Sequence, residues 1–346
     1  MEYDDEMRNV DITEDKDLPE DAKRYFRILD SFKGKKVLVL GDFMLDRYVW
    51  GNVSRISPEA PIPVIHVTKE THVPGGAGNS AFNLARLGAN VCVAGVVGDD
   101  TARKELISDL ESVNIDTSGL IMTDNPTIVK QRVVARDHHI VRMDYEKLHK
   151  IRKETCDKII SYVKKKMSNL DALLISDYGK RINSEQLMPE IILLAREEDV
   201  PVIVDTKVEN YMIYKGVTVF KINNKEASMM TKIPDSSDEN IMKMGRLLQE
   251  QLETVVLMTR AKEGMLIFDR QDNIKVPTKA TKVHDISGAG DTVSSVIALS
   301  SSADADIKDA ATIASYAAAA VIGKVGTATT DIDEIKDIIK NDFRYL

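Results

Sequence analysis

The residues Gly288, Ala289, Gly290 and Asp291 could together perform chemistry on a phosphoryl group. The apolar spacing after them predicts a helix, so the three small residues precede a helix start, where exposed N–H groups and the helix dipole bind anions. Asp291 falls in the first turn, where a carboxylate can accept a proton from an attacking hydroxyl group. An anion-binding turn beside a base is sufficient for phosphoryl transfer. A helix with an aspartate in its first turn after a glycine-rich approach fits equally well, so this segment alone does not decide.

Acidic and aromatic side chains follow two predicted strands. Val37–Leu40 is a short apolar run, typical of a strand buried on both faces, and Asp42 and Asp46 follow it. Asp177 and Tyr178 end another such run. Because α/β sheets bind ligands beyond the carboxyl ends of their parallel strands, we expect these four side chains to face a ligand. A loop cap is the alternative for Asp46, and the role of Asp42 is more open.

The elements that would position these residues alternate between strands and helices. After the first strand, the predicted strands cover residues 62–68, 91–97, 128–134, 171–176, 201–205, 217–222, 255–259 and 264–269. The predicted helices cover residues 79–88, 101–113, 153–168, 184–198, 238–252 and 308–322. This alternation predicts an α/β fold, a doubly wound and mainly parallel sheet with helices on both faces.

The pattern indicates one large domain, residues 33–346, after an N-terminal extension, residues 1–32. The extension is acidic at first and ends in a predicted amphipathic helix over residues 18–32. Residues 51–68 combine three prolines with apolar side chains, which predicts edge strands that project from the main sheet as a small lid.

A glycine-rich segment fits a dinucleotide-binding fingerprint. Gly76, Gly78 and Ala81 have its spacing, and Asp99 follows at about the expected distance, which would indicate a nicotinamide-dependent dehydrogenase. In that fold the first glycine turns directly off a buried strand. Here the polar segment 69–74 intervenes and carries a proline that a central strand would not accept. The dehydrogenase is therefore the weaker hypothesis.

Four motifs in this order resemble those of the PfkB/ribokinase family of carbohydrate kinases. They are Gly75–Ala89, Asn223–Glu226 (Asn-x-x-Glu), Thr259–Gly264 and Asp285–Asp291, the last with Ile286 where the family usually has threonine. The resemblance covers residues 33 to 340, nearly the whole chain, and implies the ribokinase-like fold and ATP-dependent phosphorylation of a sugar.

The resemblance also implies residue roles. Asp291 would be the catalytic base, and Gly288, Ala289 and Gly290 would form the anion hole. Asn223 and Glu226 would organise Mg²⁺ through water. The remaining residues fall into two sets. The sugar would contact Asp46, Gly75, Gly76 and Asn79, together with Asp42, Asp177 and Tyr178. The nucleotide ATP would contact Asn223, Thr259, Arg260, Gly264, Gly288, Gly290 and Lys324. A monovalent-cation requirement is left open.

Within the family, four stretches resemble the heptose-7-phosphate kinases, the kinase half of a bifunctional heptose kinase/adenylyltransferase. They are residues 41–48, 54–64, 176–180 and 323–328. The resemblance implies transfer from ATP to the anomeric hydroxyl of D-glycero-D-manno-heptose 7-phosphate, giving the 1,7-bisphosphate. No histidine motif of a nucleotidyltransferase is present, so we expect the kinase activity alone.

A phosphorylated sugar needs cationic donors opposite Asp291. Lys130, Arg132 and Arg142 are candidates, and each is about as well explained as a solvated or ion-paired surface residue. Lys207 stands in Asp-Thr-Lys where the family has Asp-Pro-Lys, so its role is open.

Two alternatives to a heptose-phosphate kinase are kept. One is a kinase of the same family for fructose, fructose 6-phosphate, ribose or a nucleoside, and the other is a nucleotide-binding regulator without catalysis.

Charge and composition argue against several classes of protein. A formal charge of −8 over 346 residues argues against a broad nucleic-acid surface. No stretch approaches the ~20 apolar residues that span a bilayer, and the acidic N-terminus lacks the features of a signal peptide. Cys92 and Cys156 are too few for a disulfide framework, so we expect a cytoplasmic protein.

Because Ile56, Ile62 and Val64 would be exposed on a lone lid, we expect a homodimer through paired lids.

Overall fold

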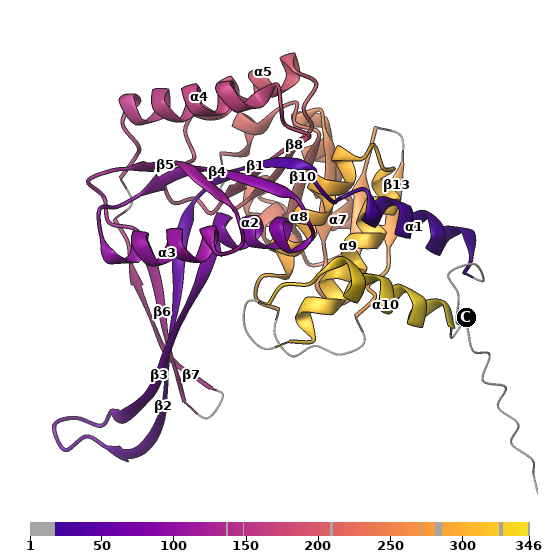
Figure 1. The fold of residues 1–346 in the computed structure, drawn as a ribbon. Coiled ribbons are helices and arrows are strands. Elements are labelled where there is room, and N and C mark those ends of the chain that lie inside the picture. The colour runs from indigo at the N-terminus through magenta and orange to yellow at the C-terminus, as the bar shows by residue number, and fades with distance from the viewer. Residues whose placement is uncertain are drawn as a thin grey trace, which may run out of the picture.

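The computed structural model describes residues 18–135, 138–147, 149–207, 210–270, 272–280, 286–324 and 328–344. Most of the extension, residues 1–17, and Asp285 of the last motif therefore lie outside the described residues. The described chain forms a nine-stranded sheet flanked by helices and a separate four-stranded sheet that projects from it (Figure 1).

The nine-stranded sheet has the order β13-β12-β11-β10-β9-β8-β1-β4-β5. Its seven neighbouring strands from β11 to β5 are parallel, and β12 and β13 continue it antiparallel at one edge. The strands are β1 (Lys36–Gly41), β4 (Asn90–Val97), β5 (Asp116–Met122), β8 (Ala172–Asp177), β9 (Val202–Thr206), β10 (Val219–Asn223), β11 (Val255–Thr259), β12 (Met265–Phe268) and β13 (Asn273–Val276). The predicted mainly parallel, doubly wound sheet is confirmed.

Helices cover both faces of this sheet because each inner strand is apolar on both sides. In β1, Val37 and Val39 pack into one core, and Leu38 and Leu40 pack into the other. The first core is completed by α1 (Glu20–Asp30), α2 (Ala77–Arg86), α3 (Thr101–Glu111), α8 (Ala289–Ser302), α9 (Ile307–Ile322) and α10 (Ile332–Arg344). The second is completed by α4 (Lys153–Met167), α5 (Leu187–Glu197), α6 (Asn224–Thr231) and α7 (Asp238–Leu252). None of the helices in the described part of the chain is long and apolar enough to cross a membrane.

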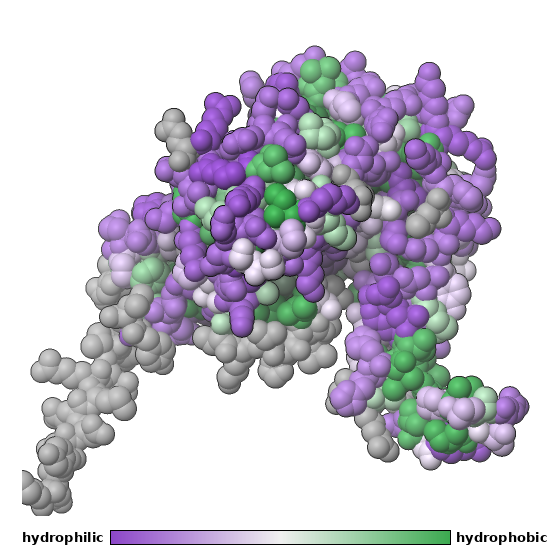
Figure 2. Space-filling model, turned by 180° about the vertical axis from the view of Figure 1, so that it is seen from behind, coloured by the Kyte–Doolittle hydropathy of each residue, from purple (hydrophilic) through white to green (hydrophobic). Residues whose placement is uncertain are grey.

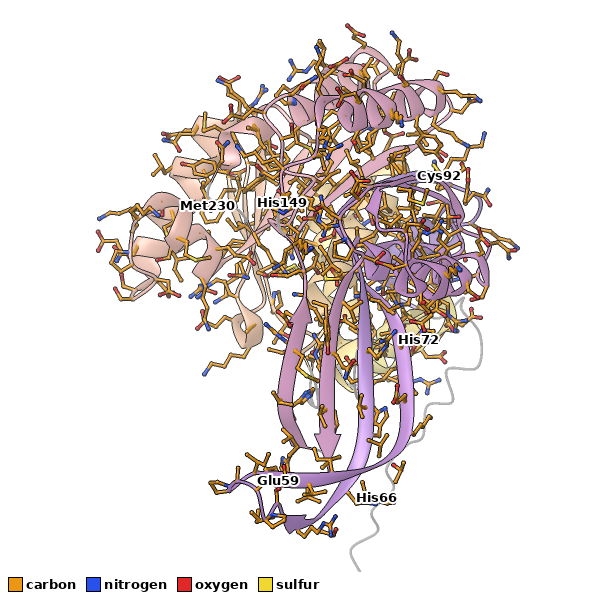
Figure 3. The ribbon with its side chains drawn as sticks, turned by 90° about the vertical axis from the view of Figure 1, so that its left-hand side faces the viewer. Glu59, His66, His72, Cys92, His149 and Met230 are labelled. Carbon is orange, nitrogen blue, oxygen red and sulfur yellow. The ribbon has the colours of Figure 1, made fainter. Side chains whose placement is uncertain are left out.

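The projecting sheet, here called the lid, has the order β3-β2-β6-β7. Its strands are β2 (Phe43–Ile56), β3 (Pro63–Gly76), β6 (Ile128–Ala135) and β7 (His138–Tyr145). The lid is therefore larger than the predicted residues 51–68, and the predicted strand 128–134 belongs to it and not to the main sheet. Figure 3 shows the long strands leaving the body side by side, with Glu59 and His66 near the tip and His72 near the base.

The lid explains why the dinucleotide fingerprint misleads. The polar segment 69–74, which the sequence indicated was not a buried strand, is part of β3, and β3 is an edge strand of the lid. An edge position accepts Pro74 because one side of the strand needs no ladder hydrogen bond. The glycines at the end of β3 thus connect the lid to α2, and no central strand of the main sheet precedes them.

Candidate active site

Asp291 lies in the first turn of α8. Its side chain is buried, and both carboxylate oxygens accept short hydrogen bonds. Asn79 of α2 donates its amide N–H to Oδ2 at 2.6 Å, and the hydroxyl of Tyr178 donates to Oδ1 at 2.6 Å. Three segments that are far apart in the sequence therefore meet at one carboxylate, and all three residues were predicted as site residues.

The surroundings make Asp291 a stronger base than a free aspartate. Burial raises the pKa of its carboxyl, and the nearby carboxylate of Asp205 raises it further. The ammonium of Lys207 and the donors Tyr178 and Asn79 oppose this rise. A raised pKa with defined donors suits a group that must accept a proton during a reaction.

The glycine turn before Asp291 has the geometry of an anion site. Gly288 caps α8 with φ of 82°, a left-handed conformation that disfavours other residues. A Cβ atom on Gly290 would lie 2.9 Å from Nζ of Lys221, so this ammonium sits directly at the helix start. Amide donors and a buried lysine thus converge there.

Lys221 was not predicted as a site residue. It lies on β10, is 5% exposed, and pairs with Oδ2 of Asp205 at 2.7 Å. Although burial favours the neutral amine, the carboxylates of Asp205 and Glu226 raise the pKa of Lys221, so it carries a charge. A single lysine inside the apolar strand Val219–Asn223, two residues before the Asn-x-x-Glu motif, is the sequence signal that could have revealed it.

Asn223 and Glu226 form a capping box at the start of α6. The side chain of Asn223 accepts from the N–H of Glu226 at 2.9 Å, and Oε2 of Glu226 accepts from the N–H of Asn223 at 2.9 Å. Burial raises the pKa of Glu226, and Lys221 opposes this. The capping box fixes the glutamate close to Lys221 and Asp205.

The same cluster offers oxygen ligands suited to Mg²⁺. Within the described residues, Oδ1 of Asp205 is buried without a hydrogen-bond partner, which fits a carboxylate oxygen that a hydrated cation would satisfy. Across that same part of the chain, no three His, Cys, Asp or Glu side chains gather closely enough to hold a metal directly. The carboxylate and amide oxygens of Asp205, Glu226 and Asn223 are of the kind that magnesium prefers.

Asp42 and Asp177, predicted as ligand contacts, are occupied by the protein itself. The carboxylate of Asp42 accepts four backbone N–H bonds of 2.9–3.0 Å, from residues 178 and 180–182. Burial and Asp177 raise the pKa of Asp42 to about 6, and the backbone donors oppose this rise because they stabilise its ionised form. Asp177 accepts from Tyr214, Asn183, Thr206 and the N–H of Gly179. Both carboxylates hold the loop that carries Tyr178.

Asp46 was expected in a loop after β1, but it lies inside β2 of the lid. It is 7% exposed and pairs with Arg132 of β6 at 2.5 Å. A Cβ atom on Gly75 of β3 would collide with its carboxylate, so any other residue there would displace the Asp46 side chain. Arg132, a candidate phosphate donor, is thus the ion-pair partner of Asp46.

Cationic side chains gather beside Asp46. Lys130 of β6 is half-buried, and burial and the ammonium of Lys180 lower its pKa. Lys180 pairs with Glu146 at 2.8 Å, and Arg142 of β7 pairs with Asp144 at 2.9 Å. Lys180 comes from the loop held by Asp42. It was not predicted as a phosphate ligand, although residues 176–180 are one of the stretches that resemble the heptose-7-phosphate kinases.

The comparisons with known proteins agree with this geometry. A family model for pfkB family carbohydrate kinases matches residues 34–334. The chain belongs to that family. It is therefore an ATP-dependent phosphotransferase with the ribokinase-like fold that the motifs implied, and the recognition from the sequence is confirmed.

Curated relatives of this kinase are similar over most of its length. The bifunctional protein HldE of Aliarcobacter butzleri is 41% identical over 305 residues, which is 88% of this chain and 64% of that protein. HldE of Geobacter sulfurreducens is 40% identical over 301 residues, 86% of this chain and 61% of that protein. The chain thus spans less than two thirds of the length of these relatives.

Solved structures share the fold of the kinase. Phosphofructokinase-2 from Escherichia coli in complex with potassium superposes with a TM-score of 0.75 at 19% identity, covering 89% of this chain and 99% of that one. Arabidopsis thaliana ribokinase complexed with ribose and ATP gives 0.71 at 16% identity, with the same coverages of 89% and 99%. These likenesses show the architecture alone.

The predicted nucleotide contacts of the kinase differ in their local surroundings. Thr259 stands beside Asn223 in the pairing of β10 and β11, next to the capping box. Arg260 pairs with Asp238 at 2.6 Å and also with Glu263. Gly264 has φ of 84°, and a side chain there would collide with the backbone of β13. Lys324 bonds the carbonyl of Thr329 at 2.8 Å and Glu334 of α10 at 2.7 Å, so its amine already has partners.

Proposed function

We propose that this kinase transfers the γ-phosphoryl group of ATP to the anomeric hydroxyl of D-glycero-D-manno-heptose 7-phosphate, with Asp291 as the base. The single observation that carries the proposal is the double anchoring of a buried carboxylate, Asp291, at a glycine-rich helix start. The choice of heptose phosphate rests on the four matching stretches and on about 40% identity to the HldE proteins.

The protein's own groups account for the two demands of the reaction. Asp291 accepts the proton of the acceptor hydroxyl as its oxygen attacks phosphorus. The amides of residues 288–290 and the ammonium of Lys221 stabilise the charge on the transferring group, because they are already oriented and need no rearrangement. This division fits a transfer that depends mainly on positioning and charge.

Asn223, Glu226 and Asp205 are the residues that would hold the water shell of Mg²⁺. When bound with the nucleotide, the ion neutralises charge on the phosphate oxygens. The capping box keeps Glu226 in place, and the pairing of Asp205 with Lys221 leaves only its Oδ1 oxygen to face a cation.

Lys130, Lys180 and Arg142 would bind the 7-phosphate of the sugar, and Asp46, with Gly75 beside it, would accept the sugar hydroxyls. Lys130 and Arg142 come from the lid, and Lys180 comes from the body. A phosphate that bridges them would draw the lid toward Asp291, and exclusion of water would suppress ATP hydrolysis.

The kinase also has a surface suited to self-association. Ile56 is 61% exposed, Ile62 is 56% exposed and Val67 is 49% exposed, whereas Val64, expected to be exposed, is only partly so. Figure 2 shows hydrophobic side chains gathered on the projecting lid. We propose that two lids pair in a homodimer and cover these side chains.

An ATP/Mg²⁺ assay over a sugar panel tests the proposed substrate. The panel holds D-glycero-D-manno-heptose 7-phosphate, fructose, fructose 6-phosphate, ribose and a nucleoside, each with and without potassium. We expect selective turnover of the heptose phosphate. Preference for another sugar would retain the family activity and refute the substrate, and bound ATP without any turnover would favour a regulatory role.

A further inference from the structure

Tyr178 is the first residue of the loop after β8, and its side chain reaches the base, Asp291. Its hydroxyl lies 2.6 Å from Oδ1 of Asp291, and the ammonium of Lys207 lies 3.7 Å from the centroid of its ring. Burial and the nearby carboxylates of Asp291 and Asp205 raise the pKa of Tyr178 well above the ordinary value, so the hydroxyl keeps its proton and donates a hydrogen bond to the carboxylate. With an ionised carboxylate as its acceptor, this hydrogen bond is charge-assisted.

The backbone of Tyr178 is fixed by groups that no substrate needs to touch. Its N–H donates to Oδ2 of Asp42 at 3.0 Å, and Asp42 also accepts the N–H groups of residues 180–182. The preceding residue, Asp177, is buried and fully engaged with the protein. These contacts fix the backbone from which the ring of Tyr178 reaches Asp291.

The donors of Asp291 leave a defined place for an acceptor hydroxyl. Oδ1 accepts from the hydroxyl of Tyr178 at 2.6 Å and from that of Ser80 at 3.5 Å, whereas Oδ2 accepts from Asn79 at 2.6 Å. Each carboxylate oxygen can accept two hydrogen bonds, so an acceptor hydroxyl can bind at Oδ2 without displacing a donor. Burial favours the protonated form of Asp291, and the tyrosine bond opposes this by stabilising the ionised form that a base requires.

We propose that Tyr178 is a positioning residue for Asp291, which holds one carboxylate oxygen so that the ionised base faces the acceptor hydroxyl. This inference rests on the proposed function, in which Asp291 is the base. It assigns Tyr178 to that base, whereas the sequence led us to expect a contact between Tyr178 and the sugar.

Tyr178→Phe separates the two roles. The variant keeps the ring against Lys207 and removes only the hydroxyl. We expect kcat to fall roughly 10- to 100-fold, the loss typical of a hydrogen bond to a charged group, with KM for the sugar unchanged. The acidic limb of the pH profile of kcat/KM should move to higher pH by about one unit, because the base loses a hydrogen-bond donor that stabilises its ionised form. A raised KM with unchanged kcat and an unmoved limb would show instead that Tyr178 contacts the sugar.

Tyr316→Phe is the matched control. Its hydroxyl donates to Asp342 at 2.6 Å, a tyrosine–aspartate bond of the same length at the C-terminal helix. Kinetics and pH profile should remain those of the wild-type protein. If this control also shifted the acidic limb, the effect would reflect general loss of a buried hydroxyl and the proposal would fail.

A titration without turnover decides the case independently. The carbon-13 carboxyl resonance of Asp291, identified by its loss in Asp291→Asn, should titrate at higher pH in Tyr178→Phe than in the wild-type protein. An unchanged titration would overturn the proposal. If the wild-type protein phosphorylated none of the panel sugars, the proposed function would fail while this titration still decided the role of Tyr178.

Discussion

Five buried aspartates, Asp42, Asp46, Asp177, Asp205 and Asp291, differ in task because they differ in partners. Asp42 and Asp177 are saturated by the protein and shape a loop, whereas Asp205 balances Lys221 and Asp291 keeps room for a substrate. Residue type and position after a strand predicted that Asp42, Asp46 and Asp177 would face a ligand. They could not show which oxygens are occupied, because many of the donors come from segments far away in the sequence.

The role of Asp42 leads to a stability prediction. In Asp42→Asn, an amide N–H₂ would face backbone N–H groups, so at least one buried donor would lose its acceptor. We expect the free energy of unfolding to fall by about 1–3 kcal/mol, measured by urea denaturation. The control Asp124→Asn alters an exposed pair with Arg152 and should change it by less than about 0.5 kcal/mol. Equal stability of the Asp42 variant and the wild type would mean that the four hydrogen bonds do not fix the loop.

Lys180 yields a prediction about the substrate phosphate. Lys180→Met should raise KM for the sugar phosphate roughly 10- to 100-fold, as expected for loss of a charged hydrogen bond, and should leave the KM for ATP unchanged. Lys158→Met, at an exposed position on α4, should have no effect. An unaltered KM in the Lys180 variant would exclude the assigned phosphate site.

At the scale of elements, the lid is tied to the body at its base and free at its tip. Arg47 of β2 pairs with Glu105 of α3 at 2.5 Å, and His72 of β3 contacts Asp109 of α3 at 2.8 Å. The sequence predicted only the tip, because the prolines and exposed apolar residues are there. The base escaped prediction because residues 43–45 are buried against the body and hide the alternation of a strand.

The exposed tip of the lid predicts an oligomeric state. The double variant Ile56→Glu with Ile62→Glu should sediment as a monomer at micromolar concentration, whereas the wild type should sediment as a dimer, because charges would face each other across the paired lids. Leu193→Glu changes a residue that is 52% exposed on α5 and should leave the dimer intact. A monomeric wild-type protein would refute lid pairing.

At the scale of the whole molecule, the buried parallel strands and the site between them were the most predictable parts. Inner strands such as β1 and β8 are continuous apolar runs, which mark them in the sequence. Polar and apolar residues are mixed in the edge strands β5, β7 and β13 and in the C-terminal helix α10. None of these four elements was predicted from the sequence. Contacts that only tertiary packing creates, such as Lys221 at Gly290, could not follow from spacing.

The predicted helix at the start of the described chain is an integral part of the body. In α1, Ala22, Phe26 and Leu29 are buried, and Arg24 pairs with Asp309 of α9 at 2.6 Å. Leu29→Ala should lower the free energy of unfolding by about 2–5 kcal/mol, measured by denaturation. Its kcat and KM below the unfolding transition should match the wild type, since α1 touches no site residue. A variant as stable as the wild type would show that α1 does not contribute to the core.

The most direct test of the whole account is single-turnover transfer from ATP to the preferred sugar in the wild type and in Asp291→Asn, with ATP binding measured in parallel. The account predicts that the variant binds ATP normally and transfers roughly 10²- to 10⁴-fold more slowly, because only the base is lost. Transfer at the wild-type rate would contradict the assignment of Asp291 as the base, and with it the chemistry inferred for this site.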